Sequence, residues 1–244
     1  MTGKDQKDTS FGSHSKVPFD FIYDVYVKYS YVRRMSIFQI RNVCEFESDM
    51  AKRLETMEEN RNKLIAAARK AFAEKGFAAA SMDELTADVG LTRGALYHNF
   101  GDKRGLLAAV VDQIDHEMAL RAKEIGAQAD GDWQGLLAEG EAYIKMALDP
   151  EVQRIVLLDG PAVLGDPSKW PSQNSCLAGT RQTVSKLLEQ EVVKPVDAEA
   201  AARLISGAAL NAALWVAASD KPADVLPKAI EAFRAMASGL LAKT

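Results

Sequence analysis

The chain has few of the residues that build cross-linked or metal-bound folds. Among its 244 residues there are two cysteines, Cys44 and Cys176, and three histidines, and neither type is clustered. Isolated cysteines exclude a disulfide framework and paired zinc ligands, and they are typical of reduced thiols. No nucleophile–base pair or phosphate-binding glycine loop is recognisable, so we expect no enzyme. The sequence also predicts no cofactor and no bound metal.

Long hydrophobic runs are scarce as well. The most apolar stretch, residues 204–218, is interrupted by Ser206 and Asn211. It is shorter than the roughly 20 residues that a membrane-spanning helix needs, and no secretory signal pattern is recognisable. These observations predict a cytoplasmic protein with no membrane partner.

The charge is nearly balanced over the whole chain, with a formal net charge of −4. Residues 51–104 hold ten Lys and Arg against eight Asp and Glu, whereas residues 105–244 hold thirteen against nineteen. A weakly basic segment is enough for DNA binding, because a few phosphate contacts per subunit suffice and a dimer doubles them. The distribution therefore favours residues 51–104 as a nucleic-acid-binding region.

The first 50 residues differ from the rest, since they lack alanine and leucine altogether. They hold nine of the 18 aromatic residues, and their charges balance at seven against seven. Three interpretations are open: a minor-groove arm, an extra dimer or ligand contact, or a segment upstream of a natural start at Met50. We favour the third and expect residues 1–50 to be an atypical, partly disordered extension. A native N-terminus at Met1, found by mass spectrometry, contradicts this hypothesis.

Residues 81–100 carry the clearest functional pattern, two short helices joined by a glycine turn. Ser81, with Glu84 three residues later, forms a capping box that starts the first helix. Gly90 predicts the left-handed end of that helix, and Thr92 caps the next one. This spacing predicts a helix-turn-helix, although a plain helical hairpin has the same spacing.

The second helix, about residues 93–100, separates apolar from polar positions. Leu96 and Phe100 share a face that can pack against the first helix. Arg93 can donate two hydrogen bonds to a guanine edge, whereas the neutral polar side chains suit phosphates or base edges. Asp102 can cap a further helix that begins at Lys103. This composition favours DNA recognition over a plain hairpin.

The segment from about Glu58 to His116 resembles the DNA-binding domain of the TetR family of bacterial transcription regulators. The similarity rests on the first helix, RNKLIAAARKAFAEKGFAAAS, and on the run DELTADVGLTRGALYHNFGDKRGLL. The resemblance implies DNA contacts by Ser81, Thr92, Arg93, Gly94, Ala95, Tyr97, His98, Asn99 and Lys103. Many relatives have a second histidine where this chain has Asn99, and an asparagine can still contact a phosphate.

The resemblance also implies the architecture, an all-α fold of two domains. A three-helix DNA-binding domain is expected over residues 51–104, followed by a helical effector-binding and dimerisation domain over residues 105–244. Helical periodicity agrees and predicts helices at about residues 103–127, 133–148, 151–158, 174–190, 197–218 and 223–242. Residues 160–171 are predicted to be a turn-rich loop.

Relatives in the TetR family dimerise through their last two helices and usually enclose a pocket for a small effector. The interface expected here consists of Ala208, Ala212, Trp215, Ile230, Phe233 and Ala237. The candidates to line the pocket are Trp133, Tyr143, Met146, Leu158, Trp170 and Trp215, each of which also fits ordinary core. We expect a homodimeric repressor that an unidentified effector releases from double-stranded operator DNA.

Three alternatives stand beside this prediction. Asp112, Asp115, His116 and Glu117 lie close together in sequence on one predicted helix, where a solvated face is favoured over a metal site. An enzyme on a helical scaffold would show turnover and no promoter binding. A helix-turn-helix protein without an effector would show no response in a thermal-shift screen.

Overall fold

Residues 37–242 are described in the computed structural model, with side chains described from residue 50 onward. The predictions about residues 1–36 lie outside the described residues. By their packing, the residues from Glu58 onward form a compact unit that is separate from the residues up to Met57. It is built from helices, and the described part of the chain contains no strand beyond a single bridge between Val193 and Leu241.

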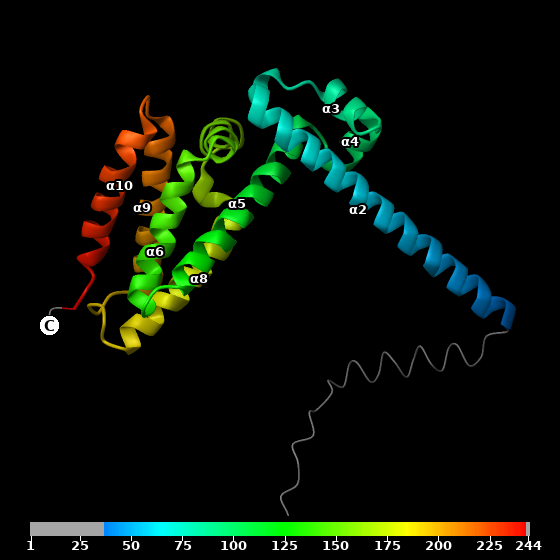
Figure 1. Ribbon diagram of the computed structural model, residues 1–244. Helices are drawn as coiled ribbons and strands as arrows, with labels where there is room; N and C mark the ends of the chain where they lie inside the picture. Colours follow the sequence, from blue (N-terminus) through cyan, green and yellow to red (C-terminus); the bar gives the residue numbers. More distant parts are fainter. Residues whose placement is uncertain (1–36, 243–244) are drawn as a thin grey trace, which may run out of the picture. The chain divides into compact units, whose positions relative to one another are not determined.

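Three helices form the predicted DNA-binding region (Figure 1). They are the C-terminal part of α2 (Ile37–Ala79), α3 (Met82–Asp88) and α4 (Arg93–Phe100). Their shared core consists of the buried side chains of Leu64, Ala68, Phe72, Leu85 and Leu96. The core fixes α4 against α2 and α3, and it leaves the opposite face of α4 free.

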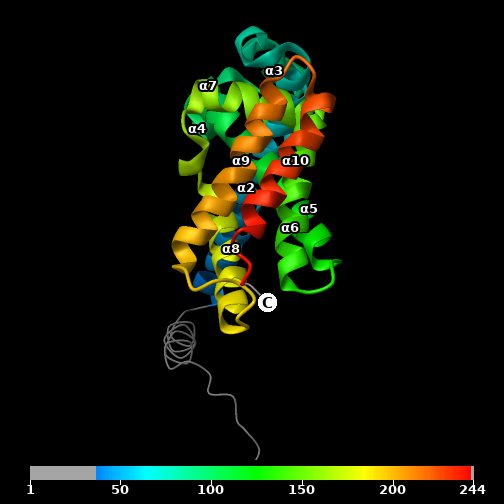
Figure 2. The same ribbon diagram turned by 90° about the vertical axis from the view of Figure 1, so that its left-hand side faces the viewer.

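The remaining helices form a bundle that begins with α5 (Lys103–Ala127) and α6 (Asp132–Lys145). They continue with η1 (Met146–Leu148), the π-helix η2 (Val152–Asp159), α7 (Gly160–Leu164), η3 (Pro167–Lys169), α8 (Pro171–Glu189), α9 (Ala198–Ala218) and α10 (Pro222–Ser238). Helix α9 packs against α6, α8 and α10 (Figure 2). Helices α5 and α6 approach closely where glycines meet, because a Cβ atom on Gly126 would lie 2.9 Å from the carbonyl oxygen of Gly135.

The predicted helices are confirmed with shifted ends. Helix α8 starts at Pro171, three residues earlier than predicted, because proline fits the first position of a helix. The turn-rich loop predicted for residues 160–171 is wrong in part, since it contains α7 and η3. Helix α10 ends at Ser238, short of residue 242, because the chain then turns and the amide of Ala242 donates to the carbonyl of Val192 at 3.0 Å.

Helix α9 corrects the length argument made from the apolar run at residues 204–218. The helix extends over 21 residues, and by length and composition it is long enough and apolar enough to cross a membrane. A core helix of a bundle passes the same test, and α9 has neighbours on several sides within the bundle.

The predicted domain boundary after residue 104 falls in the first turn of α5. Residues on both sides of it belong to one compact unit, because α5 contacts α4 as well as α6. A single helix therefore runs from the DNA-binding region into the bundle (Figure 1).

Candidate nucleic-acid interface and interior cavity

The helix-turn-helix is held by the three caps that the sequence predicts. Thr92 Oγ1 accepts from the amide of Ala95 at 3.2 Å, and Asp102 Oδ1 accepts from the amide of Gly105 at 2.7 Å. Ser81 Oγ accepts from the amide of Glu84, but the reciprocal half of the capping box is absent. The carboxylate of Glu84 instead accepts from Lys75 Nζ at 2.6 Å.

The turn itself depends on a left-handed glycine. Gly90 has φ 68°, and it joins the last residues of α3 to Leu91 and the cap of α4. A side chain at this position would be strained, so the sequence prediction of a glycine turn is confirmed.

The face of α4 opposite the core is exposed. Leu96 has no exposed surface, whereas the side chain of Tyr97 is 52% exposed. The exposed members of the predicted DNA-contacting set are Thr92, Arg93, Gly94, Tyr97 and His98, and the half-buried members are Ser81, Ala95, Asn99 and Lys103. The structure thus brings most of the set onto one open helix surface.

Besides the capping residues Ser81 and Thr92, three of these side chains already have partners within the protein. Arg93 forms an ion pair with Asp83 of α3, and Asn99 Nδ2 donates to the carbonyl of Ala95 at 2.8 Å. Lys103 Nζ donates to the carbonyl of Ala78 at 3.3 Å and lies 4.7 Å from the centroid of the Phe77 ring. Burial lowers the pKa of Lys103 from its usual value. These side chains must leave or share their partners to contact DNA.

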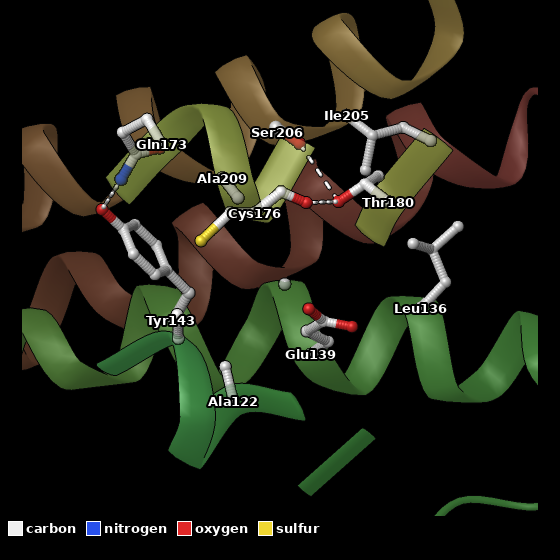
Figure 3. Close-up of a pocket in the computed structure, with 12 residues that line it drawn as sticks. Ala122, Leu136, Glu139, Tyr143, Gln173, Cys176, Thr180, Ile205, Ser206 and Ala209 are labelled. Atoms are coloured by element: carbon white, nitrogen blue, oxygen red, sulfur yellow. Dashed lines mark hydrogen bonds between the residues drawn. The ribbon is translucent and has the colours of Figure 1, made fainter. Parts of the chain in front are cut away.

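The bundle holds a cavity of about 60 Å³ between α5, α6, α8 and α9 (Figure 3). Its apolar wall consists of Ala119, Ala122, Leu136, Ile205 and Ala209, with Gly140. Its polar wall consists of Glu139, Tyr143, Gln173, Cys176, Thr180 and Ser206. A mostly apolar cavity with a few polar groups is typical of a small-molecule site.

Only Tyr143 of the predicted pocket residues lines this cavity. Trp133 and Met146 are buried in the core, and Trp170 closes a second hollow beside the start of α5. Leu158 and Trp215 are 38% and 50% exposed on the outside of the bundle. The large side chains fill space, whereas the cavity lies where alanines and short polar residues leave it open.

Sequence reasoning missed the polar side of the cavity on α8. Gln173, Cys176 and Thr180 recur at spacings of three and four residues, so they share one face of a helix. A polar stripe on a helix within a bundle was the available signal. The predicted start of this helix at residue 174 hid the stripe in part, because Gln173 lay just outside the predicted helix.

A buried polar network stands beside the cavity. Asp115 of α5 has no exposed surface, and Gln173 Nε2 donates to its two carboxylate oxygens at 3.2 and 3.0 Å. The same nitrogen is 3.4 Å from the hydroxyl oxygen of Tyr143. Burial raises the pKa of Asp115, and the hydrogen bonds from its neighbours oppose that shift. Burial also raises the pKa of the Tyr143 hydroxyl, and it raises the pKa of the Cys176 thiol to about 11.

The four residues considered as a metal site point in different directions. Glu117 accepts from Arg69 Nη1 at 2.8 Å, whereas Asp115 faces Gln173 inside the bundle. Within the described residues, no group of three or more His, Cys, Asp or Glu side chains is placed to hold a metal ion.

The exposed apolar residues of α9 and α10 differ from the predicted dimer interface. Phe233 and Ala237 are buried within the protomer, because Phe233 packs over Gly140 of α6. Ala208, Ala212 and Ile230 are half-buried, and Trp215 is 50% exposed. Leu204 and Met236, which were not predicted, are 73% and 52% exposed.

Charged contacts connect the DNA-binding region to the bundle. The guanidinium of Arg69 on α2 donates to Glu151 at 2.7 and 2.8 Å as well as to Glu117 of α5. These carboxylates raise the pKa of Arg69 further above its usual value. The amide of Phe77 donates to Asp159 Oδ2 at 2.8 Å, so both ends of η2 are tied to α2.

The exposed second helix of a helix-turn-helix and a cavity in the bundle, connected by α5, define a class of protein, the helix-turn-helix protein with a C-terminal helical domain. Two family models match the chain. Residues 64–110 match the model "Bacterial regulatory proteins, tetR family", and residues 133–240 match "Tetracyclin repressor-like, C-terminal domain".

Individual relatives agree with the family models. A solved TetR-family transcriptional regulator from Pectobacterium atrosepticum is 48% identical, with a TM-score of 0.72, over 78% of this chain and 97% of that chain. The HTH-type transcriptional repressor AcnR of Corynebacterium efficiens is 29% identical over 118 residues, which span 48% of this chain and 60% of that repressor. RolR, solved in complex with resorcinol, shares the fold at 18% identity, with a TM-score of 0.58 over 78% of this chain and 98% of RolR.

The chain belongs to the TetR family of bacterial regulatory proteins. Members of this family are DNA-binding transcriptional regulators and not enzymes, so both of these predictions are confirmed.

Proposed function

We propose that the protein is a homodimeric repressor that binds operator DNA through α4 and leaves it when a small molecule occupies the interior cavity. The single observation that carries this proposal is the course of α5. Its first residue, Lys103, lies beside the recognition helix, and Ala119 and Ala122 farther along form part of the cavity wall. A ligand that moves α5 therefore acts on both places.

The proposed DNA contacts divide by chemistry. Arg93 has the fork of donors that reads a guanine edge, and we assign it to base recognition. Thr92, Tyr97, His98, Asn99 and Lys103 are assigned to phosphates, together with Ser81, while Gly94 and Ala95 permit close approach. The protein acts on DNA, so we place it in the cytoplasm.

The homodimer is proposed from exposed apolar surface on the last two helices. Leu204 and Trp215 of α9 and Met236 of α10 are each at least half exposed, and the half-buried Ala208 and Ala212 lie on the same two-helix surface. Two copies of this helix pair can bury those side chains as a four-helix interface. A dimer also matches the two half-sites that helix-turn-helix proteins read.

Sedimentation velocity tests the dimer with Trp215→Asp, which places a charge in the proposed interface. The variant is expected to sediment as a monomer at concentrations where the parent protein is a dimer. The control is Ile125→Asp, because Ile125 is 40% exposed on α5 and lies outside α9 and α10. A Trp215→Asp protein that remains dimeric contradicts the assigned interface.

Release by a small molecule is tested with a DNA fragment from upstream of the gene. A thermal-shift screen selects compounds that raise the melting temperature, and each is added to the protein–DNA complex. We expect at least one stabilising compound to weaken DNA binding, because a ligand that favours one state shifts the population from the other. Compounds that bind the cavity and leave DNA affinity unchanged contradict the proposal of release.

A further inference from the structure

Glu139 is the charged side chain in the wall of the interior cavity. It extends from α6 on the side of the cavity opposite Thr180 of α8 (Figure 3). Glu139 also lines an outer groove that shares Ala119 and Cys176 with the cavity. Its carboxylate therefore stands between the groove and the interior, where an entering molecule meets it.

The carboxylate of Glu139 has no hydrogen-bond or ion-pair partner among the described residues. Burial raises its pKa, and the only opposing influence is the charge of Lys123, an exposed residue on α5. A partly buried acceptor without a partner is costly, and a ligand that supplies a donor removes that cost.

The hydroxyl and amide donors of Thr180, Ser206 and Gln173 are already occupied. Thr180 Oγ1 donates to the carbonyl of Cys176 at 3.1 Å, and Ser206 Oγ donates to Thr180 Oγ1 at 3.4 Å. Gln173 Nε2 is committed to Asp115 and to the Tyr143 hydroxyl, as Figure 3 shows for the tyrosine. The lining thus has acceptors to offer and few donors.

The side chains that line the cavity are acidic or neutral. No Lys or Arg belongs to the lining, and the Cys176 thiol stays protonated at neutral pH because its pKa is raised to about 11. Asp115 lies behind Gln173 and adds a second carboxyl group. Lys123 and His116 lie in the outer groove and not in the cavity lining. The uncompensated negative charge here would repel an anionic ligand, whereas it would attract a cationic ligand.

We propose that the effector is a small apolar molecule with a positively charged amine, whose ammonium group binds the Glu139 carboxylate while its hydrocarbon part contacts Leu136, Ile205 and Ala209. This inference names the class of ligand that the cavity of the proposed function binds. It rests on that function only in the expectation that ligand binding releases the DNA.

Isothermal titration calorimetry on the full chain tests the ligand class with three probes that share one carbon skeleton. They are 2-phenylethylamine, 2-phenylethanol and phenylacetate. The amine is expected to bind at least about tenfold more tightly than the alcohol, because a charge-assisted hydrogen bond to a desolvated carboxylate adds roughly that factor. Phenylacetate is expected to be the weakest of the three. This comparison needs no variant, so it does not depend on how any substitution folds.

The variant Glu139→Gln keeps the shape of the side chain and removes its charge. It is expected to lose the tenfold preference for the amine, while binding of the alcohol stays within about twofold. Glu124→Gln is the matched control, because Glu124 is an exposed glutamate on α5 that is not part of the cavity lining. The control is expected to keep the preference.

The result that overturns the ligand class is equal or tighter binding of the alcohol or of phenylacetate. No detectable heat with the amine at about 10 mM, weaker than the affinity range of specific ligands, also overturns it. DNA binding is measured on the same samples. An amine that binds through Glu139 and leaves DNA affinity unchanged supports the ligand class and contradicts the proposed release. A protein that binds DNA and shows no amine preference contradicts the ligand class and supports the DNA-binding part of the proposed function.

Discussion

The recognition helix α4 and the interior cavity differ in how far along the chain their residues find partners. The hydrogen bonds that the side chains of α4 donate are local: Arg93 pairs with Asp83, ten residues away, and Asn99 bonds to Ala95, four residues away. In the cavity Gln173 bonds to Asp115, 58 residues away. Local contacts leave a pattern that can be read in the sequence, whereas distant contacts depend on how helices pack.

The largest expected effect is on the free energy of unfolding, and it concerns Leu96, a core residue of α4 outside the proposed set of DNA contacts. Leu96→Ala removes a side chain with no exposed surface, so it should lower the free energy of unfolding by about 2–5 kcal/mol, as cavity-forming substitutions do. Leu148→Ala is the control, because Leu148 is 41% exposed, and its effect should stay within about 0.5 kcal/mol. Urea denaturation measures both. Equal losses would show that the two positions are packed alike.

This contrast explains what the sequence could predict. The caps at Thr92 and Asp102 and the turn at Gly90 are set within a few residues, and all three are present in the structure. Of the predicted pocket residues, Tyr143 lines the cavity and the others do not, because large side chains such as Trp133 fill space. The cavity occurs where Ala122 and Ala209 from separate helices face each other, and no local pattern marks that pairing.

The dimer residues show the same limit. Periodicity placed Phe233 and Ala237 on an apolar stripe of α10, but it could not distinguish the side toward α6 from an outer side. The structure assigns both residues to the protomer core and leaves Met236 outside. An amphipathic pattern predicts that one face of a helix is buried. Which element that face packs against depends on the tertiary contacts.

A second prediction tests whether Arg93 carries sequence information. Arg93→Ala should reduce discrimination at one base pair of the operator by about 1–3 kcal/mol, because it removes a bidentate contact to a guanine. Binding to a panel of single-base operator variants measures the change. Arg121→Ala is the control, since Arg121 is exposed on α5 away from α4. An unchanged preference would reassign Arg93 to a phosphate.

A third prediction concerns the phosphate contacts. Lys103→Ala should weaken binding to all DNA sequences alike and reduce the salt dependence of affinity by about one counterion. Tyr97→Ala should also weaken all sequences alike. Titrations at several salt concentrations measure these changes, with Lys228→Ala on α10 as the control. A sequence-selective loss in either variant contradicts the division between base and phosphate contacts.

The smallest expected effect concerns Asp115, which belongs to the polar network beside the cavity. Because burial raises its pKa, the folded protein holds this proton more tightly than the unfolded chain does. Its contribution to stability is therefore greatest at low pH and is lost as the pH rises through the folded-state pKa. Asp115→Asn should raise the melting temperature at neutral pH and flatten that pH dependence. A lower melting temperature at pH 7 would show that the hydrogen bonds from Gln173 outweigh burial.

The central claim is that α4 reads a specific DNA sequence, and equilibrium binding to selected DNA tests it most directly. DNA is selected from a random pool by the full chain, and fluorescence anisotropy compares the selected duplex with a shuffled duplex of the same composition. At physiological salt we predict a Kd of roughly 10⁻⁸–10⁻¹¹ M for the selected duplex and binding at least about a thousandfold weaker for the shuffled one. Equal affinity for both duplexes would contradict the claim.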